Sequence, residues 1–277
     1  MTITAQDVNK LRQMTGAGMM DCKKALTEAQ GDFDKAIDLL RKKGQKVSAA
    51  RADRKTSEGS VFVRTNDDRT EGVLIALNCE TDFVAKNEDF QNLGKSILAA
   101  AYEKAPGSIE ELGALPLGEG TIQEKITDMV GKIGEKIEVS AYERLSADAV
   151  VAYIHAGSKL GVLVGLTGTN GTNVESAGKD VAMQIAAMNP VAVDKDDVDA
   201  SVVSRELEIG KEQARAEGKP DNIIDKIAEG KLNKFYKENT LLNQAFVKDS
   251  SLTIAKYLET VNHGLTVNQF KRVAIGS

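Results

Sequence analysis

The sequence is poor in aromatic residues and in the residues that usually bind metals or act as nucleophiles. Aromatics make up 4% of its 277 residues, Trp is absent, and there are two Cys and two His. Cys22 and Cys79 lie far apart outside any CxxC pair, and His155 and His263 are the only histidines. A zinc site needs about four such ligands at close spacing, so we expect no metal site. The core must be built from Val, Ile, Leu and Ala.

Enzyme motifs are also missing. The sequence contains no GxSxG, no HExxH and no glycine loop that ends in Lys-Ser or Lys-Thr. A thiol enzyme that uses Cys79 and Glu80 stays formally open, but the sequence offers no supporting base or oxyanion donors, and small buried thiols are common. We therefore expect a protein without chemical catalysis of its own and without a cofactor.

Positive charge and long apolar runs are lacking as well. The net charge is −5, so no chain-wide positive field attracts phosphate backbones, and we expect no direct nucleic-acid partner. The basic stretches at 41–46 and 51–55 fit a solvated helix end that leads into a linker. Residues 1–7 form no apolar signal region, and no apolar run is long enough to span a membrane. We expect a cytoplasmic protein with no membrane partner.

What the sequence does contain begins with a short helical module. Thr4, with Asp7 three residues later, resembles a capping box and predicts the start of a helix. Glycines at positions 16, 18 and 31 divide the segment that follows, so three helices are expected within residues 1–47. Such a module has little core and is expected to dock onto something larger. Residues 48–58, rich in Ala and in charge, predict a tether.

An internal repeat follows this module. The run from Gly72 to Leu77 matches the run from Gly161 to Leu166, and both are apolar, β-branched and bounded by Gly, as buried strands are. Each copy is preceded by a strand-like segment and followed by an Ala-rich helix, at 60–64 and 90–101 in the first copy and at 150–156 and 177–187 in the second. The pattern predicts an α+β fold with two related subdomains, each with helices on one face of an antiparallel sheet.

The remaining segments complete these subdomains and add a helical hairpin. Residues 190–246 are highly charged, and Gly218-Lys-Pro220 splits them as expected for an antiparallel helix pair. The near-heptad apolar seam comprises Val203, Leu207, Ala214, Ile224, Ala228, Leu232 and Phe235. A helix at 121–130, a strand at 137–142, a helix at 252–261 and a strand at 265–275 are also predicted. The expected division is 1–47 for the helical module, 48–58 for the linker, 59–145 for the first subdomain and 146–277 for the second, with the hairpin inserted at about 190–246.

The two copies differ most in the connection between strand and helix. The second copy has a Gly- and Asn-rich turn at 167–173, whereas the first has Asn-Cys-Glu-Thr-Asp-Phe-Val-Ala-Lys at 78–86. This connection has no structural need for a large apolar side chain, since the second copy manages without one. Phe83 is therefore a candidate for contact with a partner. The alternative is an adaptor that recruits partners through its three-helix module and its charged hairpin, in which Phe83 only anchors the loop in the protein's own core.

Residues 15–26, Thr-Gly-Ala-Gly-Met-Met-Asp-Cys-Lys-Lys-Ala-Leu, together with 79–86, resemble the bacterial elongation factor Ts family. Further similarity lies at Lys132-Ile-Gly-Glu135, at His155 with Gly161-Val-Leu-Val164 and at Gly218-Lys-Pro220, so the resemblance covers nearly the whole chain. It implies a ubiquitin-associated-like N-terminal module and a two-subdomain core with a coiled-coil hairpin. It also implies guanine-nucleotide exchange in translation elongation, with elongation factor Tu as partner in its GDP-bound and nucleotide-free forms.

The resemblance further implies roles for single residues. Asp82 and Phe83 would insert near the nucleotide pocket of the GTPase and displace Mg²⁺ so that GDP leaves and GTP can bind, while Thr81 and Val84 would shape the loop. The partner contacts carried over with them are Lys23 in the helical module, Ile133 and Gly134 beside the Phe83 loop, and His155 near a second contact.

Three of these partner contacts have plain alternatives. Lys23 can be a solvated helix residue, Ile133 can belong to the core, and His155 can be a structural histidine in a strand. Some members of the family continue into a helical C-terminal module that contacts the GTPase again. This sequence ends at Ser277, so the resemblance does not carry that contact over.

Overall fold

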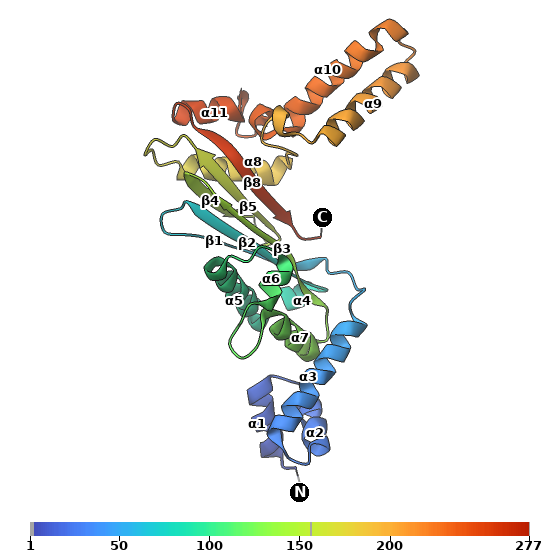
Figure 1. Ribbon diagram of the computed structural model, residues 1–277, viewed down its shortest axis with the longest axis vertical. Helices are drawn as coiled ribbons and strands as arrows, with labels where there is room; N and C mark the ends of the chain where they lie inside the picture. The colour runs from blue at the N-terminus through green and yellow to red at the C-terminus, as the bar shows by residue number, and fades with distance from the viewer. Residues whose placement is uncertain (1–2, 156, 277) are drawn as a thin grey trace.

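The molecule is elongated, with helices at both ends and two three-stranded sheets in the middle (Figure 1). The computed structural model describes residues 3–155 and 157–276. The N-terminal helical module consists of α1 (Ala5–Thr15), α2 (Met19–Glu28) and α3 (Phe33–Ala50). The predicted capping box is confirmed, because the Asp7 N–H donates to Thr4 Oγ1 at 3.2 Å and the Thr4 N–H donates to Asp7 Oδ2 at 3.0 Å. All three helices contribute to its small core: Val8, Leu11, Cys22, Ala25, Leu26, Ala29 and Ala36.

Helix α3 extends further than the sequence suggested. It ends at Ala50, so residues 48–50, which were expected to begin a tether, are helical. Its C-terminal half packs against α7 (Ile122–Ile133) where Gly44 meets Gly131, and a Cβ placed on Gly131 would lie 2.7 Å from the Gly44 Cα. Because neither residue has a side chain, the two backbones approach each other directly. Helix packing therefore holds the N-terminal module against the rest of the molecule.

The two central sheets are antiparallel and have the same strand order. The first pairs β1 (Glu58–Thr65), β2 (Glu71–Cys79) and β3 (Ile137–Ser146), and the second pairs β4 (Ala149–Ile154), β5 (Leu160–Thr167) and β8 (Thr266–Ala274). One face of the first sheet is covered by α5 (Glu88–Lys104), α6 (Ile109–Ala114) and α7, and one face of the second by α8 (Glu175–Met188) and α11 (Ile254–Val261). The predicted α+β fold with antiparallel sheets is confirmed.

Several element boundaries differ from the expectation, among them those of two elements in the second subdomain. The helix predicted at 252–261 begins at Ile254, because Leu252 belongs to the strand β7 (Asp249–Thr253) and Thr253 caps the helix. β7 pairs with the short strand β6 (Ala245–Phe246). Of the strand expected at 150–156, residues 150–154 lie in β4, and residue 156 lies outside the described residues.

Strand β2 is buried on both faces because the two sheets also pack against each other. Val73, Ile75 and Leu77 face the helices, whereas Leu74 and Ala76 face the second sheet. This explains why the sequence shows a continuous apolar run here instead of an alternating pattern. The core between the sheets consists of Val61, Leu74, Ala76, Leu145, Val150, Leu163 and Ile275.

The repeated glycines permit this sheet-to-sheet contact. A Cβ on Gly72 would lie 2.8 Å from Val150 Cγ1 of the second sheet, and a Cβ on Gly161 would lie 2.5 Å from Val61 Cγ1 of the first. Val61 and Val150 hold matching places in the two copies, as do the two glycines. Each copy therefore receives the same side chain of the other at the same point, as in an isologous interface.

Backbone hydrogen bonds repeat the same reciprocity. The Val61 N–H donates to the Ser158 carbonyl at 2.7 Å, and the Val150 N–H donates to the Arg69 carbonyl at 2.5 Å. Arg69 and Ser158 occupy equivalent turns and both have left-handed φ angles, 53° and 58°. Both central strands also shift register at the same place, between residues 76 and 77 and between 165 and 166.

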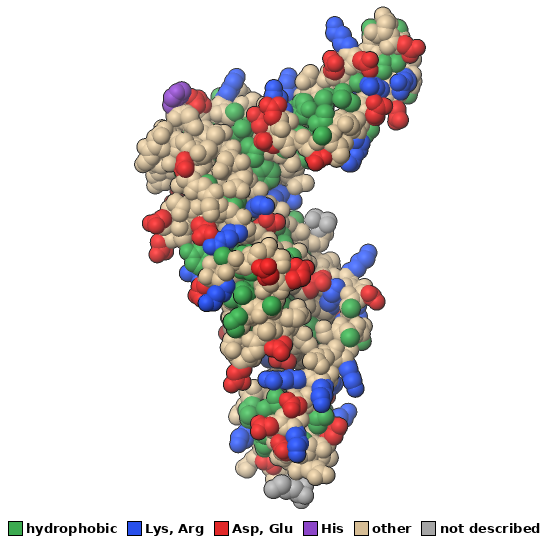
Figure 2. All heavy atoms as spheres, viewed as in Figure 1, with side chains coloured by type: hydrophobic (Ala, Val, Ile, Leu, Met, Phe, Trp, Pro, Cys, Tyr) green, Lys and Arg blue, Asp and Glu red, His purple; other side chains and the backbone are tan. Residues whose placement is uncertain are grey.

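The helical hairpin projects from the second sheet, at the end of the molecule away from the N-terminal module (Figure 1). It consists of α9 (Ala200–Ala216) and α10 (Asp221–Asn239), with the left-handed Gly218 (φ 69°) between them, so the predicted break is confirmed. Of the residues in the predicted seam, Ala214, Ile224 and Ala228 are buried and the others are half-buried. The pattern missed Gly210, which packs directly on Ala228. Short 3₁₀ turns at Lys195–Asp197 and Leu241–Asn243 flank the hairpin. Acidic and basic side chains intermingle over the face of the molecule that Figure 2 shows, the hairpin included.

Candidate functional site

The candidate site is the segment from Thr81 to Lys86, here called the Phe83 turn, which connects β2 to α5. The sequence predicted a loop, but Asp82–Ala85 form a single helical turn, α4. Thr81 caps it in an extended conformation, and its Oγ1 accepts from the Val84 N–H at 3.4 Å. Asn87 then caps α5 directly afterwards, because its Oδ1 accepts from the Asp89 N–H at 2.9 Å. Two successive caps thus fix where the turn begins and ends.

Within this turn, Phe83 points away from the protein. Phe83 is 82% exposed, whereas Val84 and Ala85 are 8% and 7% exposed and pack into the core beneath the first sheet. The Ala85 carbonyl is also held from below, since Gln91 Nε2 donates to it at 2.6 Å. The alternative in which Phe83 anchors the loop in its own core is therefore wrong. An apolar ring of this size in water has no stabilising role in the isolated chain.

Asp82 is also at the surface, paired with the last residue of the turn. Lys86 Nζ lies 2.7 Å from Asp82 Oδ2, one helical turn away. The hydrogen bond from Lys86 lowers the pKa of Asp82, and the same contact raises the pKa of Lys86. Both side chains are well exposed, so the pair is screened by solvent and can exchange partners at little cost.

Ile133 is the last residue of α7 and Gly134 caps it, and the residue that follows them, Glu135, contacts the Phe83 turn. Gly134 ends α7 in a left-handed conformation with φ 84°, and a Cβ there would meet nothing within 4 Å. Glu135 comes next, and its carboxylate accepts from both the N–H and the O–H of Thr81. Ile133 is half-buried against the core under the first sheet, so part of it is structural.

Lys23 and His155 lie elsewhere, and among the described residues no hydrogen bond or ion pair joins either of them to the Phe83 turn. Lys23 is exposed on α2. His155 is exposed at the start of the turn after β4, where its Nδ1 lies 2.9 Å from Tyr153 Oη and its N–H donates to the Leu160 carbonyl at 2.9 Å. It therefore belongs to a hydrogen-bonded turn and not to a buried strand.

Sequence reasoning missed three exposed methionines in the N-terminal module. Met14, Met19 and Met20 are 55%, 53% and 63% exposed and flank the break between α1 and α2. Met19 and Met20 lie on α2, the helix that also carries Lys23. For Met19 and Met20 the signal lies in the Gly-Ala-Gly-Met-Met string, which predicted a helix break and carries part of the family resemblance, but from which no exposed apolar surface was inferred. Methionines are flexible and polarizable, which suits them to binding surfaces.

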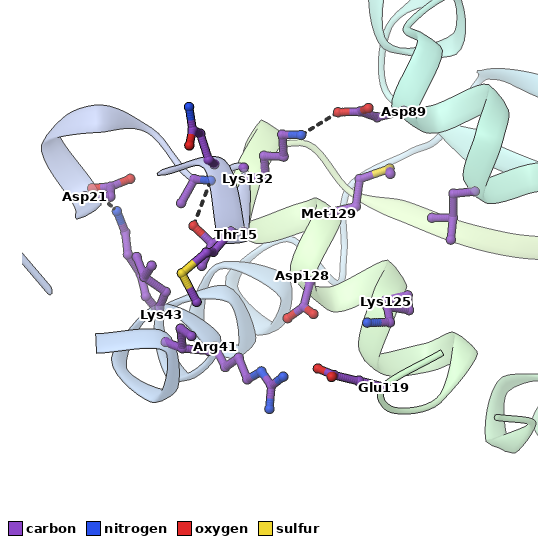
Figure 3. Close-up of a pocket in the computed structure, with 18 residues that line it drawn as sticks. Thr15, Asp21, Arg41, Lys43, Asp89, Glu119, Lys125, Asp128, Met129 and Lys132 are labelled. Carbon is purple, nitrogen blue, oxygen red and sulfur yellow. Dashed lines mark hydrogen bonds and ion pairs between the residues drawn. The ribbon is translucent and has the colours of Figure 1, made fainter. Parts of the chain in front are cut away.

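A cleft of about 570 Å³ separates the N-terminal module from the core (Figure 3). Charged residues face each other across it, with Arg41 from α3 on one side and Lys125 and Asp128 from α7 on the other. An ion pair between Lys132 and Asp89 lies at its edge. Its walls carry charges of both signs, and no residue of the Phe83 turn lines it.

The structure disfavours the thiol-enzyme alternative. Burial, with the nearby Glu135 and Glu58 carboxylates, raises the pKa of the Cys79 thiol to about 12, so it is protonated at neutral pH. Its residue is fully buried. In residues 3–155 and 157–276, no three His, Cys, Asp or Glu side chains are grouped so that they could hold a metal ion. Nor is any helix in that part of the chain long and apolar enough to cross a membrane.

Comparison with known proteins gives one consistent match. The family model described as "Elongation factor TS" matches residues 80–277, a range that begins one residue before the Phe83 turn. The protein named elongation factor Ts of Amoebophilus asiaticus is 60% identical over 277 residues and 100% of both chains. Proteins of the same name from Cytophaga hutchinsonii and Porphyromonas gingivalis are 60% identical over 275 residues (99% of each chain) and 50% identical over 278 residues (100% of each chain).

Proposed function

We propose that this chain, which belongs to the elongation factor Ts family, acts on its partner through the Phe83 turn. Members of this family are nucleotide exchange factors for elongation factor Tu and carry out no chemical catalysis of their own. The observation that carries this proposal is the exposure of Phe83, 82%, on a turn whose next two residues, Val84 and Ala85, are buried and whose Ala85 carbonyl is hydrogen-bonded. A large apolar side chain that is held in water by a rigid base is suited to enter a crevice of another protein.

Phe83 is proposed to act as a wedge. GDP is held in a GTPase by backbone amides that bind its phosphates and by Mg²⁺, whose octahedral coordination tolerates little distortion. Burial of the ring between elements of elongation factor Tu would contribute about 2 kcal/mol. This free energy is available to favour a partner conformation in which Mg²⁺ is displaced and GDP is bound weakly. The turn is already formed, so little is lost to ordering it on contact.

Asp82 is the proposed polar companion of the wedge. In the free chain its carboxylate is paired with Lys86 at the surface, and that pair is screened by solvent. On contact, the carboxylate can accept a hydrogen bond from the partner or repel an acidic group beside the Mg²⁺ site. Thr81 and Val84 would shape the turn, one as its cap and the other as its buried anchor.

The coupling between the factor and the nucleotide is reciprocal. Whatever free energy the factor uses to weaken GDP binding, an incoming nucleotide uses to expel the factor. The exchange factor therefore accelerates the replacement of GDP by GTP and leaves the equilibrium between the two nucleotide complexes unchanged.

Further contacts with the partner are proposed at three places. Lys23, with the exposed Met19 and Met20 on the same helix, would form a mixed apolar and basic contact from the N-terminal module. The α7 cap, with Ile133 and Gly134, would contact the partner beside the Phe83 turn. His155 would contribute near a second contact, from the turn after β4.

We further propose that the two sheets with their helices are related copies and that the domain division is 1–47, 48–58, 59–145 and 146–277, with the hairpin inserted in the second copy. The matching strand order, the shared register shifts and the reciprocal contacts of Gly72 and Gly161 support the duplication. The three-helix arrangement of the N-terminal module supports a ubiquitin-associated-like fold for it.

The test is the release of a fluorescent GDP analogue from elongation factor Tu in excess unlabelled nucleotide. The wild-type chain should accelerate release, Phe83→Ala should lose most of this acceleration, and Val247→Ala should accelerate release as the wild type does. Val247 is a suitable control because it is also an exposed apolar residue, at 51%, in the segment between β6 and β7. No acceleration by the wild type would refute exchange by this chain, and full activity of Phe83→Ala would refute the wedge alone.

A further inference from the structure

The Phe83 turn is too short to hold its own shape. Its helix, α4, has four residues, and helices of this length do not form alone in water. The internal cap is long, since the Val84 N–H lies 3.4 Å from Thr81 Oγ1. Val84 and Ala85 anchor one side of the turn in the core, but the exposed Phe83 adds little. The start of the turn therefore needs support from outside the segment.

Glu135 gives that support from a distant part of the sequence. Its Oε2 accepts from the Thr81 N–H at 3.0 Å, and its Oε1 accepts from the Thr81 O–H at 2.7 Å. Both carboxylate oxygens thus bind one residue, through its backbone and its side chain. Because the O–H of Thr81 points to Glu135, a lone pair on the hydroxyl oxygen is left for the Val84 N–H. Hydrogen bonds to a carboxylate are shorter and stronger than those between neutral groups.

The position of Glu135 is itself fixed by its neighbours. The preceding Gly134 ends α7, and its N–H donates to the Val130 carbonyl at 2.8 Å. The following residue, Lys136, donates its N–H to Glu80 Oε1 at 2.7 Å. Glu80 and Thr81 are adjacent, as are Glu135 and Lys136, so the two segments exchange carboxylate-to-backbone hydrogen bonds in both directions.

This arrangement differs from simple support of the sheet. Strands β2 and β3 are already paired at this end, with Cys79 opposite Ile137. Glu138, one residue further along β3, makes comparable contacts, since it accepts from Thr56 Oγ1 at 2.6 Å and pairs with Lys136 at 3.0 Å. Only Glu135, of these two carboxylates, contacts the turn that carries Phe83.

We propose that Glu135 is a positioning residue for nucleotide exchange, which holds the Phe83 turn in the orientation that meets the partner. The proposal rests on the proposed function of Phe83. Through Glu135, the turn and the α7 cap with Ile133 and Gly134 form one rigid surface. Loss of the carboxylate leaves Phe83 in place but lets the turn sample other orientations, so ordering it on contact consumes binding free energy that otherwise acts on the nucleotide site.

A double-mutant cycle on the full chain tests this proposal, with the release rate of a fluorescent GDP analogue from elongation factor Tu at saturating chain as the readout. Glu135→Ala should lower the maximal rate by about tenfold, because both hydrogen bonds from Thr81 to the carboxylate are lost. In a Phe83→Ala background the same substitution should change the rate by less than about twofold, because Glu135 acts through Phe83. Glu138→Ala, the matched control, should change the rate by less than about twofold in both backgrounds.

The other outcomes overturn the proposal. An equal loss in both backgrounds shows that Glu135 acts independently of Phe83, and no loss in the wild-type background shows that the turn needs no positioning. If Glu135→Ala does not fold, as judged by thermal unfolding, Glu135→Gln takes its place in the same cycle. It keeps one acceptor oxygen and should lose at least threefold in the wild-type background only. A Phe83→Ala variant that is as active as the wild type refutes the proposed function of the turn instead.

Discussion

Phe83 and Val84 are adjacent in sequence, but substitution of Val84 should mainly lower stability, whereas substitution of Phe83 should mainly lower exchange activity. Phe83 is 82% exposed and Val84 is 8% exposed. Val84→Ala removes buried carbon atoms from the core under the first sheet and should lower the free energy of unfolding by about 1–2.5 kcal/mol. Phe83→Ala removes a ring that is mostly in water and should change it by less than about 0.5 kcal/mol. In the exchange assay the order reverses, since Phe83→Ala should lose most of the acceleration.

Urea unfolding followed by circular dichroism measures the free energy of unfolding. Release of a fluorescent GDP analogue measures the exchange activity, at a temperature where both variants are folded. Val84→Ala should keep most of its exchange activity under these conditions, because Ala still supports the helical turn. The reasoning fails if Phe83→Ala destabilises the chain by more than about 1 kcal/mol, since the ring would then pack within the protein.

Three further predictions concern the sheets, the thiol and the N-terminal module. Gly72→Ala and Gly161→Ala should each destabilise the chain by about 1–3 kcal/mol in urea unfolding, because the new Cβ meets a valine of the opposite sheet. Val61→Ala should restore part of the stability that Gly161→Ala loses, but none of the stability that Gly72→Ala loses. Folding raises the pKa of Cys79 from 9.0 to about 12, so the unfolded chain loses this proton first, and the thiol makes stability fall as pH rises from 9.0 towards about 12. Iodoacetamide at pH 8 should therefore modify Cys79 slowly in the folded chain and quickly in urea, by mass spectrometry; equal rates would contradict its burial. Lys23→Glu should raise the chain concentration for half-maximal exchange several-fold with an unchanged plateau, and a lower plateau would assign Lys23 to the exchange step itself.

The parts of the fold that sequence predicted well are those that local chemistry decides. The capping box at Thr4 and the break at Gly218 depend on residues within a few positions of one another, and both are confirmed. The repeated apolar runs at Gly72 and Gly161 predicted the two central strands because a strand buried on both faces needs such composition.

The parts that sequence did not predict depend on contacts between distant segments. The packing of the two sheets on each other, and the meeting of Gly44 with Gly131, leave no local pattern in the sequence. The same holds for Glu135, which belongs to the family motif at 132–135 but lies 54 positions from Thr81, so no local pattern joins the two residues. At Phe83 the comparison of the two repeated connections identified the residue, but only the structure shows that its ring is in water.

The most direct test of the central claim is the rate of GDP release from elongation factor Tu as a function of chain concentration, for wild type, Phe83→Ala and Val247→Ala. If the Phe83 turn opens the nucleotide site, Phe83→Ala should reach a plateau at least about tenfold lower than the other two, because about 2 kcal/mol of ring burial no longer acts on that site. A plateau equal to that of the wild type, reached at any concentration, would contradict the account.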